Sequence, residues 1–149
     1  MKEVDVLALK NYIQHSNFNR LEHCMGVAYI SFIIAKKFDI KVNYHDLIRG
    51  ALLHDFYFYD WHKKEESPRL HGYVHAKIAM INAIKEVKDL SDKEKNIIYS
   101  HMWPLNITHL PLSKEASLVC IADKYCASYE VLFRQKTLLP SKIRKLVLA

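Results

Sequence analysis

Apolar and polar positions alternate with helical spacing along most of the chain, and capping residues indicate where the helices begin. Asn19 followed by Glu22 forms a capping box that predicts a helix running to about Phe38. Asn43 can cap a second helix, which fades near Tyr57. The polar stretch that follows, over about residues 59–70, is predicted to be a loop.

The second half of the chain contains helix start and stop signals of the same kind. Ser91 and Glu94 form another capping box, and that helix must end near Trp103 because Pro104 disfavours helical geometry in the residue before it. Further helices are expected over about residues 4–14, over about 72–87, from Ser113 to about 134, and in a short basic segment beginning at Pro140.

These elements predict an all-α fold, a single-domain bundle of about six to seven helices that spans residues 1–149. Breakers are few, with three Gly and four Pro, and half of the residues are hydrophobic. A chain of this length can bury a core without disulfides or a structural metal.

Composition narrows the class of protein. The three cysteines lack metal-binding spacing and lie in apolar stretches, which favours reduced thiols and a cytoplasmic location. The charged N-terminus predicts no signal peptide, and no apolar run approaches the ~20 residues of a membrane helix. The net charge of +6 fits either a solvated surface or attraction to anionic substrates. The sequence shows no RNA-binding signature of alternating basic and aromatic residues.

Two aspartates lie where ion pairing is difficult. No Lys or Arg occurs between Arg49 and Lys63, the stretch that contains His54 and Asp55, and Asp123 lies within the apolar run SLVCIADKYCASYE. A buried unpaired carboxylate costs several kcal/mol, so two of them in one small domain predict a shared cation.

The chain contains two His-Asp pairs, which helical geometry separates. His45-Asp46 precedes His54-Asp55 by nine positions. At ~100° per residue this is ~900°, or opposite faces of one helix. The first pair lies in a first helical turn, where an acid caps the helix and faces water, and is predicted to be structural. The second pair follows an apolar run and is predicted to face the interior and bind metal.

Other histidines extend this pattern over several predicted helices. Helices that converge in a bundle can direct such side chains into one pocket. Mixed imidazole and carboxylate ligands suit Fe, Mn, Zn, Ni or Co. The candidates, in chain order, are His23, His54 with Asp55, His71 or His75, His101 and Asp123.

This order of residues resembles the HD superfamily of metal-dependent phosphohydrolases. RLEHCMGVA (20–28) is similar to its first motif, and IADKY (121–125) to its closing I-A-D-Y segment. HGYVHA (71–76) resembles the H-G-x-V-G-A segment of bacterial members that split diadenosine tetraphosphate symmetrically, in which a His-Thr pair stands at the position of HMWP (101–104). The motifs lie within residues 20–130. FYFYDWH and HMWP resemble another, little-characterised bacterial subgroup more closely, which leaves the substrate open.

The resemblance implies one or two divalent ions, of Fe, Mn, Zn, Ni, Co or Mg, that activate water beside His54 and Asp55. His23, His54, Asp55 and Asp123 would hold one ion, and Asp55 could bridge to a second held by His71 and His101. His75 stands where the related motif has Gly and competes with His71, which the motif alignment favours. The expected substrate contacts are His75, Arg20, Lys124 and Trp103. For Arg20 and Lys124 a surface ion pair is the alternative, and for Trp103 core packing.

Three functions remain open from the sequence. The first is hydrolysis of a phosphomonoester, phosphodiester or phosphoanhydride of a small, nucleotide-like substrate. The second is a non-catalytic HD module that binds or senses a nucleotide. The third, a nucleic-acid-binding helical domain, predicts salt-dependent binding that survives a chelator. We expect no membrane partner, and the sequence does not indicate an oligomeric state.

Overall fold

The computed structural model describes residues 6–15, 17–63, 68–134 and 137–148, and confirms an all-α fold. Its elements, in chain order, are a 3-10 helix η1 (Val6–Asn11), strands β1 (Ile13–His15) and β2 (Phe18–Asn19), and helices α1 (Arg20–Lys37), α2 (Tyr44–Leu53), α3 (His71–Glu86), α4 (Asp92–Ser100), α5 (Lys114–Leu132) and α6 (Ser141–Leu148).

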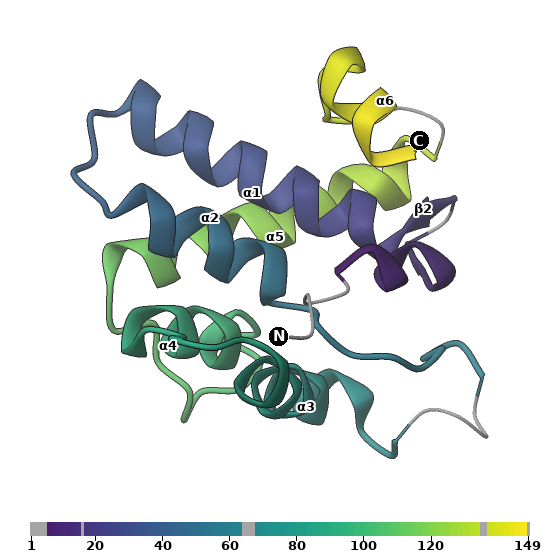
Figure 1. Cartoon of the computed structure of the whole chain (residues 1–149), viewed down its shortest axis with the longest axis horizontal. Coiled ribbons are helices and arrows are strands. Elements are labelled where there is room, and N and C mark those ends of the chain that lie inside the picture. Colours follow the sequence, from purple (N-terminus) through teal and green to yellow (C-terminus); the bar gives the residue numbers. More distant parts are fainter. Residues whose placement is uncertain (1–5, 16, 64–67, 135–136, 149) are drawn as a thin grey trace.

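Helix α1 runs across the molecule and packs against α2 and α5 (Figure 1). Helix α4 packs against α2 and α5 in turn, and α3 lies against α4. Buried apolar side chains fill the space between these helices in two clusters, one around Val27, Leu47 and Val119 and the other around Leu21 and Phe56. The end of α2 lies close to the start of α1, where the rings of His54 and His23 are 5.3 Å apart. The ends of α2 and α4 both lie close to the middle of α5, at Asp123 and Lys124.

The predicted helix starts are confirmed by the capping interactions. Both capping boxes form, with the side chain of Asn19 accepting from the backbone N–H of Glu22 and that of Ser91 accepting from Glu94. Asn43 and Ser113 cap α2 and α5 through their side-chain oxygens. Each cap satisfies a backbone donor that the first helical turn leaves without a partner.

Helices α2 and α4 approach each other closely at Gly50. A Cβ atom placed there would lie 2.6 Å from Cδ1 of Ile97, so no larger residue fits without a shift of Ile97. Gly50 lies one turn before His54, and Ile97 one turn before His101. The close approach thus brings these two histidines together at the ends of their helices.

The prediction of an N-terminal α-helix over about residues 4–14 was wrong for the described part of that range. Residues Val6–Asn11 form a 3-10 helix, and Ile13–His15 pair antiparallel with Phe18–Asn19, while Val4 and Asp5 lie outside the described residues. In a strand successive side chains face opposite sides. Ile13 is accordingly exposed and Gln14 is buried, which directs the amide of Gln14 inward.

Two helices end earlier than the sequence indicated. Helix α2 ends at Leu53 rather than near Tyr57, and α4 ends at Ser100 rather than near Trp103. In each case the next residue is a histidine at the helix C-terminus, His54 or His101. No helix in the described part of the chain is long and apolar enough to cross a membrane.

Candidate metal centre

Six candidate ligands come together in the interior from five places in the fold. His23 lies on α1, His75 on α3 and Asp123 on α5, while the ends of α2 and α4 provide the others. All six are at most 8 % exposed. They are His23, His54, Asp55, His75, His101 and Asp123, and overlapping groups of three among them have ligand atoms within 4.8 Å of one another.

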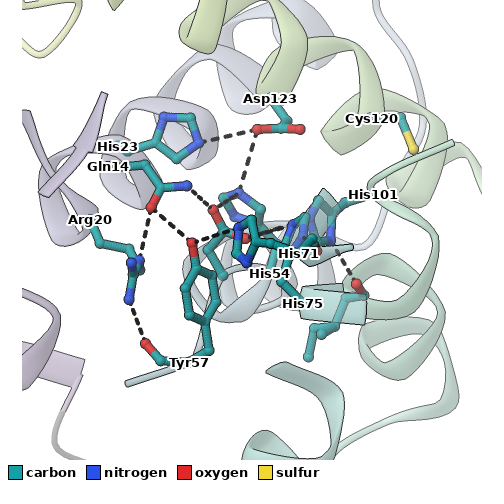
Figure 2. A network of polar contacts seen from close by, with 12 residues as sticks. Gln14, Arg20, His23, His54, Tyr57, His71, His75, His101, Cys120 and Asp123 are labelled. Atoms are coloured by element: carbon teal, nitrogen blue, oxygen red, sulfur yellow. Dashed lines mark hydrogen bonds and ion pairs between the residues drawn. The ribbon is translucent and has the colours of Figure 1, made fainter. Parts of the chain in front are cut away.

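Asp123 joins the histidines of α1 and α2. Its Oδ1 lies 3.1 Å from Nε2 of His23 and 3.6 Å from Nε2 of His54 (Figure 2). Nε2 of His54 is also 3.5 Å from Oδ2 of Asp55. Two imidazoles and two carboxylates therefore face one point, as the sequence predicted for the first ion.

Asp55 links this group to a second one. Its Oδ1 lies 3.3 Å from Nε2 of His75 and 3.5 Å from Nε2 of His101. The two imidazole nitrogens are themselves 2.9 Å apart. Asp55 thus stands between the two sets of histidines, the position expected of a bridging carboxylate.

The hydrogen bonds of the rings fix which nitrogen faces the centre. Nδ1 of His54, His75 and His101 each lies 2.7–2.9 Å from a backbone carbonyl oxygen, which can only accept, so Nδ1 carries the proton. In a neutral ring Nε2 is then a lone pair. The lone pairs of His75 and His101 would face each other at 2.9 Å, and a cation between them, either a proton or a metal ion, is needed to offset their repulsion.

Two buried polar atoms at the centre also indicate a bound cation. Oδ1 of Asp55 and Nε2 of His54 are buried and have no hydrogen-bond partner. An unsatisfied buried polar atom is costly unless something outside the protein pairs with it. The residues present therefore fit a divalent metal ion, because each of these atoms is a good ligand and the rings are already in the tautomer that metal binding requires.

The charges in this centre are also set by the side chains themselves. Burial alone would raise the pKa values of Asp55 and Asp123, but the surrounding histidines hold the pKa of each carboxyl well below its usual range. Burial and the neighbouring His54 lower the pKa of His101 to about 3. Against the effect of burial, the neighbouring carboxylates in turn raise the pKa values of His23, His54 and His75. The metal-free centre therefore holds protons beside its two ionised carboxylates, and a divalent ion would displace them.

A cavity of about 260 Å³ opens beside this centre. Asp55, His75, His101 and Asp123 form its floor, and its walls combine polar and apolar side chains. The wall residues are Gln14, His15, Trp61, His71, Gly72, Met102, Leu105, Lys124 and Ala127.

The HD domain family model matches residues 20–128 of the chain, nearly three quarters of its length, and spans all six candidate ligands. The chain belongs to the HD domain family. No curated protein and no solved structure matches it significantly.

Within this HD domain the structure places His75, and not His71, among the ligand atoms. Both lie on α3, but His71 is its first residue and points toward the cavity wall. Its ring stacks between Trp61 and His75, and its Nδ1 is 2.9 Å from the hydroxyl of Tyr59. The geometry therefore does not agree with the motif-based preference for His71. It agrees with the alternative ligand, His75.

Arg20 is not available to bind phosphate. Its side chain is fully buried, and its guanidinium donates to Oε1 of Gln14 and to the carbonyl oxygens of Tyr57 and Tyr59. It also stacks on the ring of Tyr57. The structure therefore corrects the expected phosphate contact: Arg20 ties the N-terminal strand to the segment after Asp55.

Lys124 and Trp103 differ in whether they line the cavity. Lys124 lines the cavity, and its ammonium donates to the carbonyl oxygens of His101 and Cys120. Trp103 is 38 % exposed and is not among the cavity residues. Of the four expected substrate contacts, Lys124 and His75 are thus the ones that line the cavity.

Two polar residues that the sequence did not indicate support the centre. Gln14 donates through its amide to Oδ2 of Asp55, and Figure 2 shows it between Arg20 and the histidines. Glu130 lies 2.9 Å from Nδ1 of His23. The seven-residue spacing from Asp123 to Glu130, two turns along an apolar helix, is a signal that would have found Glu130. Gln14 was obscured by the incorrect helix prediction.

The other His-Asp pair lies on the opposite side of α2. Asp46 accepts a hydrogen bond from the hydroxyl of Ser91, and the side chain of His45 is exposed. With Glu94 these two residues also form a group of possible ligand atoms. There, however, Nη1 of Arg49 lies 3.4 Å from the Glu94 carboxylate and already provides a cation. Asp46 is buried by its contact with Ser91, so the expectation that it faces water was wrong, although these contacts are of a structural kind.

Proposed function

We propose that the protein is a metal-dependent phosphohydrolase acting on a small nucleotide-like phosphoester or phosphoanhydride. The observation that carries this proposal is the pair of Nε2 atoms of His75 and His101, 2.9 Å apart beside the unpartnered Oδ1 of Asp55. A divalent ion bound here would supply positive charge for phosphoryl oxygens and lower the pKa of a water molecule. Membership of the HD domain family supports the same reaction class.

The chain's own residues would provide the rest of the reaction environment. The ionised Asp55 and Asp123 would bind the metal ion at the floor of the cavity. The buried imidazoles around them would exclude bulk water from the ion. Gln14 holds one oxygen of Asp55 and leaves the other free to face His75 and His101. This division of the two oxygens suits a carboxylate shared between two ions.

The cavity wall favours a small anionic substrate with an apolar part. Lys124 places an ammonium group at the rim, where it can pair with phosphate oxygens. Met102, Leu105 and the ring of Trp61 also line the cavity and offer apolar surface suited to a base or another flat group. The volume of the cavity, about 260 Å³, suits a small molecule better than a polymer or a membrane surface.

Removal of metal should abolish hydrolysis, and its return should restore it. We expect protein treated with a chelator and then freed of it to lose turnover of nucleoside mono- and diphosphates, dinucleoside polyphosphates and an aryl phosphate. Addition of Mn²⁺, Fe²⁺, Co²⁺, Ni²⁺, Zn²⁺ or Mg²⁺, each in a separate assay, should restore hydrolysis with at least one ion. The assay measures released phosphate or nucleotide product.

The same assay separates the proposal from the alternative of a nucleotide sensor. A sensor would bind a nucleotide, detectable by calorimetry, without any turnover of the panel in the presence of these ions. That result would contradict the proposed enzyme. Lys124→Met serves as a probe of the wall, because it keeps an unbranched apolar side chain of nearly the same length and removes the charge.

A further inference from the structure

The four candidate ligand histidines divide into two kinds by the partner of Nδ1. In His54, His75 and His101 the partner is a backbone carbonyl oxygen, which no side-chain substitution removes. In His23 the partner is the carboxylate of Glu130, whose two oxygens lie 2.9 and 3.1 Å from Nδ1. His23 is therefore the candidate ligand whose orientation depends on another side chain.

The position of Glu130 makes this contact strong. Glu130 is 5 % exposed and His23 is fully buried, so water competes little for either group. Among the residues that the structure describes, no Lys or Arg forms an ion pair with Glu130, and its partner is His23. A hydrogen bond to an ionised acceptor is about twice as strong as one between neutral groups.

Helix geometry places Glu130 opposite the metal side of the His23 ring. Glu130 follows Asp123 by two turns of α5, so both acids face α1. The Asp123 carboxylate is 3.1 Å from Nε2 of His23, and that of Glu130 lies at Nδ1. The imidazole is thus held at both ends by acids from one helix. Glu130 lies beyond residue 128, where the family match ends.

We infer that Glu130 is a positioning residue of the metal centre: it holds the Nδ1 proton of His23 and thereby directs the Nε2 lone pair to the metal. The inference rests on the metal site of the proposed function, not on turnover. An ionised carboxylate can only accept, so Nδ1 must donate to Glu130. Without metal, Nε2 faces the ionised Asp123 in the same way and donates to it, and a metal ion would take the place of that proton. Removing such an outer partner typically weakens metal affinity 10–100-fold.

Zn²⁺ titration of Glu130→Gln tests this role without an activity assay. The substitution keeps the size of the side chain and removes its charge. We expect Zn²⁺ affinity, measured by calorimetry on metal-free protein, to fall by ~10–100-fold with unchanged stoichiometry. Glu115→Gln is the matched control, because Glu115 is a buried acid on the same helix that pairs with Lys93 and the backbone of Asn43. It should leave Zn²⁺ affinity within about twofold of wild type.

Ring-nitrogen NMR of the zinc-loaded wild type provides a second measurement that does not depend on the variant's folding. His23 should show a protonated Nδ1 and a metal-bound Nε2. A metal-bound Nδ1 would overturn the inference. So would an unchanged affinity in Glu130→Gln. A loss of one Zn²⁺ equivalent in that variant would also overturn it, because Glu130 would then be a ligand, as its proximity to His15 allows.

Failure of this inference can be told apart from failure of the proposed function. Wild-type protein that binds no Zn²⁺ would overturn the metal centre, and the inference with it. Wild-type protein that binds Zn²⁺ with the predicted His23 geometry, but hydrolyses no phosphate compound, would contradict the enzyme and support the role of Glu130.

Discussion

Asp55→Asn should remove metal binding and hydrolysis together. Asp55 is in contact with both groups of histidines, and its ionised form supplies half of the carboxylate charge among the six candidate ligands. The amide keeps the shape of the side chain and can still accept from Gln14. We expect metal affinity, measured by calorimetry, to fall by at least ~100-fold, because a ligand should matter no less than its outer partners. Turnover should fall below detection.

Asp46→Asn is the matched control for this change. Asp46 belongs to the other His-Asp pair, on the opposite side of α2, and its oxygen accepts from Ser91. An amide oxygen can accept the same hydrogen bond, so metal affinity and turnover should stay within about twofold of wild type. Equal damage from the two substitutions would mean that the wrong pair had been assigned to the metal.

Only His75→Ala, and not His71→Ala, should weaken metal binding. His75 presents Nε2 to Asp55 and His101 and is buried, so its loss should weaken or remove one bound ion and abolish turnover. His71 stacks on Trp61 in the cavity wall. Its loss should leave metal content unchanged and raise KM for the substrate.

Metal analysis of the two purified variants by plasma mass spectrometry, with steady-state kinetics, makes this comparison. His101→Ala provides a reference for the loss of an expected ligand. If His71→Ala lost metal and His75→Ala retained it, the geometry described for α3 would be contradicted.

The helices could be predicted because their start signals are local. The caps at Asn19, Asn43, Ser91 and Ser113 depend on residues within one turn, and each forms as expected. The N-terminal segment could not be predicted in this way. Its apolar spacing suited a helix, but Ile13–His15 pair with the nearby Phe18–Asn19. The burial of Gln14 depends on Asp55, which is 41 residues away in sequence.

The site was predictable in its residue types more than in its exact geometry. The absence of Lys and Arg from its stretch indicated Asp55, and an apolar run indicated Asp123. The order of the histidines indicated the helices that meet there. The choice between His71 and His75 depends on how α3 packs against α4, which motif spacing does not contain. Arg20 adjoins the first motif, but whether its guanidinium meets substrate or backbone carbonyls is set by the fold around Tyr57.

The most direct test of a shared metal centre is anomalous X-ray scattering from crystals grown with Mn²⁺ or Zn²⁺. We expect a peak among His23, His54, Asp55 and Asp123, with a second one beside Asp55, His75 and His101 if two ions bind. A peak confined to His45, Asp46 and Glu94, or no peak among the six interior ligands at full metal loading, would contradict the account.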